Sequence, residues 1–344
     1  MSQLAQFEPL IEFDLLSKYI GPRSAAWRAE GHLPWLLNAS VIAGSRSPKL
    51  AAEWAQNQKI GHRAEIIRTL NLASDTEAQL ELEHDLAAYD SVASNLSGSL
   101  EGSIDQVIST LGVDPAFVLV SPFQNSGVRT DLLARLLSRR GRKTELLARL
   151  DISSFEELRE NLTSEQIDEI VGSSLWRKLW EDGAQSASFT RISVLYRTSL
   201  QRRGFTFARE IPLHTSAAEP ASSYLIFASR SRLGVALMSD LVCRYRRAHC
   251  EPQKDIKELY DQVYELGGRL ESASTNRIVQ GLSAELFGEF QITDYRRVLR
   301  ELVRRELIDR ADCNGIEDDE ILAFNGTSQM ALFDSQMLTA TAAE

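Results

Sequence analysis

Ala39-Ser40-Val41-Ile42-Ala43-Gly44 is the stretch of the sequence that decides the fold class. It is a run of small and β-branched residues that ends at a glycine, which predicts a strand followed by a tight turn. Ser47 then suits the N-cap of a helix and Pro48 suits its first position, so we expect a helix over residues 47–58. The stretch therefore indicates the order strand, turn, helix.

The same order repeats on the C-terminal side of this stretch. Apolar runs predict strands over residues 66–73, 95–100, 117–120, 145–150, 206–213 and 223–229. Helical spacing of apolar residues predicts helices over residues 75–88, 103–111, 129–137, 164–171, 175–181, 189–203 and 233–247. On the N-terminal side, apolar residues at helical spacing within residues 10–37 predict two short helices, with a break at Gly21-Pro22 and an end at Gly31 to Pro34. Strands that alternate with helices indicate an α/β fold with a parallel sheet.

A second, smaller domain is expected after Glu251-Pro252. Its predicted helices cover residues 254–266, 277–287 and 293–305, and its predicted strands cover residues 307–310 and 320–324. Three helices followed by a hairpin indicate a winged helix over residues 251–326. From residue 327 to residue 344 no packing period is found among the Gly, Ser, Thr and Ala residues, so we expect a flexible tail.

The composition excludes several classes of protein. The chain has 344 residues and 43% hydrophobic composition, which is enough for two folded units. No apolar run approaches the roughly 20 residues that span a bilayer, and residues 1–13 do not resemble a signal peptide, so we expect a cytoplasmic protein. Cys243, Cys250 and Cys313 lack the spacing of a metal site, and the five histidines are scattered. With a net charge of −10, any contact with DNA must be local.

Three segments match motifs of a known family: Ile42-Ala43-Gly44-Ser45-Arg46, Ser121-Pro122-Phe123-Gln124, and Tyr224 to Ser229 followed by Gly234 and Met238. In these segments the chain resembles the three-Cys-motif partner proteins. The family has Phe-Ala-Gly-Pro-Gly in the first place and Asp-Pro-Phe-Gly in the second. The resemblance covers roughly residues 15–241. It implies that residues 1–250 form a Rossmann methyltransferase-like domain, and that the partner is a radical-SAM protein related to spore photoproduct lyase.

Two departures from the family motifs bear on catalysis. Arg46 stands where a methyltransferase needs a glycine, whose bare backbone can approach S-adenosylmethionine. Ser121 replaces the Asp that would face the reacting amine, although some cytosine-N4 methyltransferases also use Ser there. We therefore expect a degenerate cleft without a cofactor and without catalytic residues, formed by Gly44, Ser45, Arg46, Asp75, Ser121, Pro122, Phe123 and Gln124.

Several of these cleft residues also have a purely structural interpretation. Asp75 follows the second predicted strand, where an acid can bind ribose hydroxyls, but a helix cap is the expected role. Pro122-Phe123 can be a packed aromatic in a strand-to-helix turn. An active S-adenosylmethionine-dependent methyltransferase that acts on nucleic acid stays open as the alternative.

The predicted helix over residues 293–305 has a basic face. Tyr295, Val298, Leu299 and Leu302 form an apolar stripe, which leaves arginines on the other side. We expect these arginines to contact DNA phosphates or a groove, as in a recognition helix: Arg296, Arg297, Arg300, Arg304 and Arg305. Against this, acidic residues outnumber basic ones by 16 to 10 in residues 252–326, and Glu317-Asp318-Asp319 lies in the predicted wing. A solvated face on a packing helix is the alternative.

The tail contains Gln329-Met330-Ala331-Leu332-Phe333, which resembles the Gln-x-x-Leu-Phe peptide that binds the bacterial DNA sliding clamp. Gln329 can hydrogen-bond at one pocket, and Met330, Leu332 and Phe333 can insert apolar surface. The alternative is a tail that folds back onto its own domain.

Together these features predict a non-catalytic accessory factor of DNA repair or replication. We expect it to bind the sliding clamp and a radical-SAM or other DNA-repair partner, with a possible DNA contact and with no membrane. A methyltransferase on nucleic acid is the first alternative, and a winged-helix regulator is the second.

Overall fold

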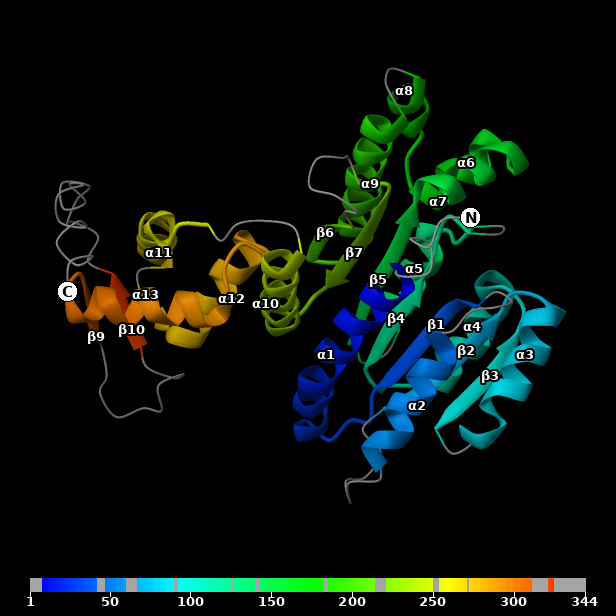
Figure 1. Cartoon of the computed structure of the whole chain (residues 1–344), viewed down its shortest axis with the longest axis horizontal. Coiled ribbons are helices and arrows are strands. Elements are labelled where there is room, and N and C mark those ends of the chain that lie inside the picture. Colours follow the sequence, from blue (N-terminus) through cyan, green and yellow to red (C-terminus); the bar gives the residue numbers. More distant parts are fainter. Residues whose placement is uncertain are drawn as a thin grey trace. The chain divides into compact units, whose positions relative to one another are not determined.

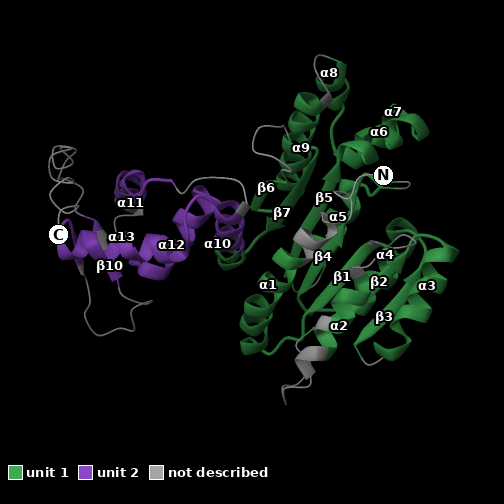
Figure 2. Cartoon of the chain, viewed as in Figure 1, with its two compact units in different colours: residues 1–237 green, residues 238–344 purple. Residues whose placement is uncertain are grey.

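The computed structural model describes residues 8–41, 47–59, 67–89, 92–124, 127–139, 141, 143–181, 185–213, 221–249, 254–270, 272–310 and 321–324 (Figure 1). The chain divides into two compact units, residues 1–237 and residues 238–344 (Figure 2). The second unit begins at Met238, inside the helix α10 (Arg232–His249). The two units are described separately below.

The first unit is built on a seven-stranded sheet with the strand order β3-β2-β1-β4-β5-β7-β6. The strands are β1 (Trp35–Val41), β2 (Arg68–Ala73), β3 (Ala93–Ser97), β4 (Ala116–Val120), β5 (Thr144–Asp151), β6 (Phe207–Leu213) and β7 (Ser223–Ser229). β1 to β5 pair in parallel, and β7 is antiparallel to both β5 and β6. The predicted α/β fold is therefore confirmed, and the predicted parallel sheet is found over β1 to β5, whereas β7 is antiparallel. β1 and β4 are neighbours, so the strand order reverses between them.

Helices cover both faces of this sheet (Figure 1). The helices of this unit are α1 (Glu8–Ala29), α2 (Ser47–Lys59), α3 (Thr76–Leu86), α4 (Leu100–Leu111), α5 (Thr130–Ser138), α6 (Ile152–Asn161), α7 (Ser164–Val171), α8 (Trp176–Glu181) and α9 (Gln185–Arg202), with a short 3-10 turn over Ala87–Tyr89. On one face, Leu37 and Val118 of the sheet share a core with Leu133 of α5. On the other, Ala73 packs with Ala52 of α2. Burial on both faces explains the continuous apolar runs of the strands.

The N-terminal segment differs from its prediction. The expected break at Gly21-Pro22 is wrong, because α1 is one helix that contains Pro22. A proline inside a helix costs about 3 kcal/mol. The complete burial of Tyr19 and the burial of Trp27 at 2% exposure, on either side of Pro22, offset that cost. β1 begins at Trp35, before the strand that was predicted from Ala39.

The described part of the second unit contains three helices and a small sheet after α10. The elements are α11 (Ile256–Leu270), β8 (Ser272–Ser274), α12 (Thr275–Glu285), α13 (Ile292–Arg304), β9 (Ile308–Arg310) and β10 (Ile321–Phe324). The sheet has the order β8-β10-β9 and is antiparallel, so the predicted hairpin is confirmed and β8 adds a strand. Leu259, Leu282 and Leu302 belong to the hydrophobic core of this unit. The acidic turn Glu317-Asp318-Asp319 lies outside the described residues.

Among the helices that the structure describes, none combines the length and the apolar character that crossing a bilayer requires.

Candidate functional site

The carboxyl ends of parallel strands are the edge where α/β sheets bind ligands, at the point where the strand order reverses. In this sheet that point lies between β1 and β4. Asp75 follows β2 and Ser121 follows β4, so both lie at this edge, on either side of β1. Gly44, Ser45 and Arg46 follow β1 and lie outside the described residues. Of the expected cleft, the structure thus describes Asp75 and the segment from Ser121 to Gln124.

Asp75 is the N-cap of α3, as its preferred interpretation predicted. Its carboxylate accepts a hydrogen bond from the backbone N–H of Ala78 at 2.8 Å and another from the Ser74 hydroxyl at 2.9 Å. The hydrogen bond from Ala78, followed by that from Ser74, lowers the pKa of the Asp75 carboxyl below its ordinary value. The carboxylate is therefore charged at neutral pH and is already bonded to the start of its own helix.

The segment after β4 is a turn closed by its own backbone. The N–H of Gln124 donates to the carbonyl of Ser121 at 3.1 Å, and the N–H of Val128 donates to the carbonyl of Pro122 at 2.9 Å. Gly127 has a φ of +77°, and a Cβ there would lie 2.2 Å from the Ile170 side chain, so glycine is required. The turn is thus fixed by packing as well as by hydrogen bonds.

Phe123, the aromatic residue of this turn, belongs to the core. Its side chain is 1% exposed. Its ring centroid lies 5.1 Å from that of Phe155, 5.7 Å from that of Tyr196 and 6.3 Å from that of Phe189. A ring enclosed by three other rings cannot stack on a substrate unless it leaves the core. The packed-aromatic interpretation of Pro122-Phe123 is the one that the structure supports.

A row of asparagines crosses the sheet and was missed by sequence reasoning. Asn38 of β1, Asn71 of β2 and Asn95 of β3 are paired in register. Asn38 donates to Asn71 at 2.5 Å, and Asn71 donates to Asn95 at 3.0 Å. Asn38 is 3% exposed, and its own side-chain oxygen has no hydrogen-bond partner. One polar residue in the middle of each of three strands is the signal that could have revealed this row.

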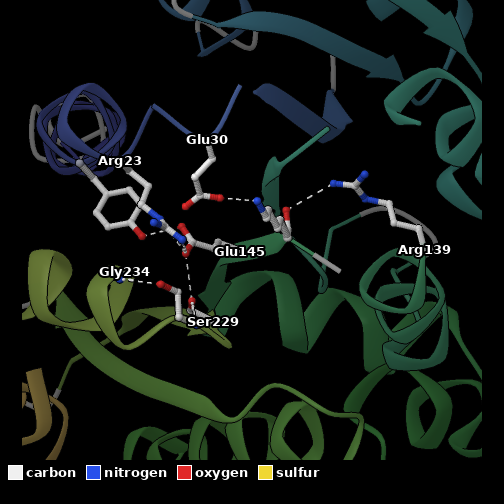
Figure 3. A network of polar contacts seen from close by, with 9 residues as sticks. Arg23, Glu30, Arg139, Glu145, Ser229 and Gly234 are labelled. Atoms are coloured by element: carbon white, nitrogen blue, oxygen red, sulfur yellow. Dashed lines mark hydrogen bonds and ion pairs between the residues drawn. The ribbon is translucent and has the colours of Figure 1, made fainter. Parts of the chain in front are cut away.

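A buried carboxylate, Glu145, lies near the start of β5 (Figure 3). It is 1% exposed and accepts hydrogen bonds from the Tyr19 hydroxyl at 2.5 Å, from Arg23 Nε at 3.0 Å and from the Ser229 hydroxyl at 3.0 Å. Arg23 also forms an ion pair with it at 3.0 Å. Burial, and then the charge of Glu145, raise the pKa of the Tyr19 hydroxyl well above its ordinary value. The carboxylate is thus fully bonded, which is what permits its burial.

Gly234 closes this polar network. A Cβ on Gly234 would lie 2.5 Å from an oxygen of Glu145 and 2.8 Å from the Tyr19 hydroxyl. Glu145 stands at the amino end of β5, and Ser229 ends the antiparallel strand β7. The network therefore lies at the edge of the sheet opposite to Asp75 and Ser121, and it ties α1 and the start of α10 to the sheet.

In the second unit, α13 has the two faces that its sequence predicted. Tyr295, Val298, Leu299 and Leu302 are buried at 0 to 2% exposure. Arg297, Arg300 and Arg304 are exposed, and Arg296 and Arg305 are half-buried. Arg304 and Arg305 both bind Glu301, at 2.8 Å and 2.6 Å. The predicted basic face is therefore present, and Glu301 neutralises part of its charge.

The first turn of α13 is held by α10, which belongs to the same unit. The backbone N–H of Ile292 donates to Asp240 at 2.8 Å, and Arg247 pairs with Asp294 at 2.6 Å. Just before α13, the N–H of Gly288 donates to the Ser239 hydroxyl at 3.0 Å. A helix of the helix-turn-helix type reads base edges with its N-terminal residues. In this chain that end of α13 is hydrogen-bonded to α10.

The clamp-like peptide Gln329 to Phe333 lies outside the described residues. Within the described part of the chain, no group of three or more His, Cys, Asp or Glu side chains could hold a metal ion.

The comparisons concern the fold alone. No protein-family model matches the chain, and no curated protein matches it. Similar solved structures include cofactor-bound Rv0187 from MTB, with 13% identity, a TM-score of 0.34 and coverage of 63% of this chain and 80% of that chain. A putative O-methyltransferase from Klebsiella pneumoniae has 11% identity, a TM-score of 0.34 and the same coverages. A putative caffeoyl-CoA O-methyltransferase from Staphylococcus aureus has 8% identity, a TM-score of 0.32 and coverage of 67% and 93%. Because these scores are below 0.5, the fold class rests on the chain's own strand order.

Proposed function

We propose that this protein is a non-catalytic accessory factor of DNA repair or replication. In this proposal the first unit is a methyltransferase-like module that binds a protein partner. The second unit is a winged helix that contacts DNA, and the C-terminal peptide binds the sliding clamp. The partner implied by the family resemblance is a radical-SAM enzyme of the photoproduct-lyase type.

The observation that carries the non-catalytic role is the use of the expected cleft residues for structure. Asp75 caps α3, and Phe123 is enclosed by three aromatic rings. Ser121 offers a hydroxyl where the related motif has a carboxylate. A methyltransferase needs groups that face the cofactor and the substrate, and these three residues supply a cap, a core side chain and a neutral hydroxyl. A protein of this fold can serve as a binding module, since fold does not dictate function.

The DNA contact is supported by the order and the charge of the second unit. Its helices and strands follow the sequence α11, β8, α12, α13, β9, β10, which is the order of a winged helix. The buried stripe of α13 turns its arginines outward. Because α10 holds the first turn of α13, the remaining surface suits phosphates rather than base edges.

The clamp peptide is the part of the proposal that one experiment can isolate. A peptide spanning residues 327–336 is expected to bind purified bacterial sliding clamp with a dissociation constant on the order of micromolar, as a short anchor would. The same peptide with Leu332 and Phe333 replaced by Ala is the matched control. A wild-type peptide that ignores the clamp would remove the link to replication and repair.

An active methyltransferase on nucleic acid is the second candidate. The observation that favours it is the sheet itself, which keeps the reversal of strand order between β1 and β4 where such folds bind cofactors. Calorimetric titration of the full chain with S-adenosylmethionine separates the two candidates. We expect no binding, and a dissociation constant in the low micromolar range would support the enzyme instead.

A further inference from the structure

Glu301 lies in the last turn of α13, beside two arginines of the basic face. Its carboxylate accepts hydrogen bonds from Arg304 at 2.9 Å and 2.8 Å, and from Arg305 at 2.6 Å. The Glu301 side chain is only 18% exposed, whereas that of Arg304 is 70% exposed. Two guanidinium groups therefore converge on one internal carboxylate at the C-terminal end of the helix.

Tyr260 of α11 lies beside the same charges. Burial raises the pKa of its hydroxyl, and the charge of Glu301 raises it further, while Arg305, Arg297 and Arg304 lower it. The hydrogen bond from Arg304 is the first cause that holds the pKa of Glu301 below its ordinary value. Glu301 is therefore a charged group at neutral pH, bonded to Arg304 and Arg305.

A carboxylate and a phosphate present similar oxygen pairs to a guanidinium group, which binds either with two parallel hydrogen bonds. We propose that Glu301 is an internal counter-ion that competes with DNA phosphates for Arg304 and Arg305, and so limits the affinity of α13 for duplex DNA. The inference rests on the DNA contact of the proposed function and adds the residue that regulates it.

The geometry makes this competition feasible. The Arg304 side chain is mostly exposed, so water around its guanidinium group weakens its ion pair with Glu301. A phosphate can therefore displace Glu301 without disturbing the buried stripe of the helix. Since the first turn of α13 is held by Asp240 and Arg247, the arginines along its outer face are the charges that a duplex can reach. Such contacts fix position on the backbone and carry no sequence information.

The test compares the full chain with its E301Q variant, using a labelled mixed-sequence DNA duplex and fluorescence anisotropy over a series of salt concentrations. Each new phosphate contact steepens the dependence of log affinity on log salt by about 0.9. If both arginines are released, the ratio of the DNA affinity of E301Q to that of the wild-type chain should increase by roughly tenfold when the salt concentration is lowered by about fourfold. The control is E265Q, which makes the same charge change in the same unit and releases Arg269 from an exposed pair.

The outcomes separate the inference from the function on which it rests. A steeper slope in E301Q, with little change in E265Q, is the expected result. If E301Q and E265Q gain equally in DNA affinity, the change in net charge explains the gain and Glu301 has no specific role. If the wild-type chain binds and E301Q is unchanged, the inference fails while the DNA contact stands. If neither protein binds at low salt, the DNA contact and the inference both fail. Unfolding in urea should show the same midpoint in all three proteins.

Discussion

Replacement of Gly234 by Ala tests the buried network around Glu145. The added Cβ would lie 2.5 Å from the Glu145 carboxylate and 2.8 Å from the Tyr19 hydroxyl, so one of these groups must move. Overpacking of this kind costs about 1–3 kcal/mol. A shift of Glu145 also weakens hydrogen bonds to a charged group, which are worth about 1.5–3 kcal/mol each. Against this, Ala is favoured over Gly in a helix by about 1 kcal/mol. We expect a net loss of about 2 kcal/mol or more from the free energy of unfolding.

Gly102 of α4 provides the matched control. A Cβ there meets the Ser99 hydroxyl at 3.6 Å, which is ordinary contact, so Gly102→Ala should stabilise the unit by about 0.5–1 kcal/mol. All five tryptophans of the chain lie before residue 181, so tryptophan fluorescence in urea follows the first unit alone. If Gly234→Ala stabilised the protein as Gly102→Ala should, the network would not be tightly packed and our account of Gly234 would be refuted.

Four further predictions test other parts of the molecule. Phe123→Ala should cost about 3–5 kcal/mol of unfolding free energy in the first unit, and a change below about 1 kcal/mol would mean that the ring is not part of the core. The pKa of Asp75 is lowered in the folded state, so its contribution to stability is present above the unfolded-state pKa and is lost as pH falls through the folded-state pKa. In Asp75→Asn the free energy of unfolding should therefore fall less steeply as the pH is lowered into the acid range. An unchanged acid limb would contradict the capping role. Joint replacement of the three exposed arginines of α13 by Ala should weaken duplex binding and reduce the slope of log affinity against log salt by about 0.9 per lost contact. An unchanged slope would mean that these arginines do not contact DNA. Replacement of Leu332 and Phe333 by Ala should abolish clamp binding without lowering the unfolding midpoint, and a lower midpoint would place both residues in the protein's own core.

Much of the fold could be predicted because its signals are local. The apolar runs at residues 117–120 and 223–229 are strands on which both faces are buried, and such runs are visible without knowledge of their neighbours. The stripe of α13 was equally visible as a helical period. The N-terminal helix was not, because Pro22 is a strong local signal that long-range packing of Tyr19 and Trp27 outweighs.

The candidate site was harder to predict, because a residue type does not reveal what its side chain contacts. Phe123 could be assigned from the sequence either to the cleft or to a packed turn, and Asp75 either to ribose or, as was preferred, to a helix cap. In the structure, Phe123 packs in a cluster with Phe155, Phe189 and Tyr196, and Asp75 caps the start of α3. Both outcomes depend on which elements lie nearby, and in the case of Phe123 those elements are distant in sequence.

The same reasoning explains what the sequence could not reveal about α13. Periodicity shows which side of a helix is polar, but it does not show what covers the end of the helix. Asp240 reaches the first turn of α13 across 52 positions of sequence, and Arg247 joins it through Asp294. Glu301 lies within the basic stretch and reads as one acid among five arginines, yet two of those arginines bind it. The net charge on the outer face of α13 is therefore smaller than its composition suggests, and under the proposed DNA contact it would depend on whether a phosphate replaces Glu301.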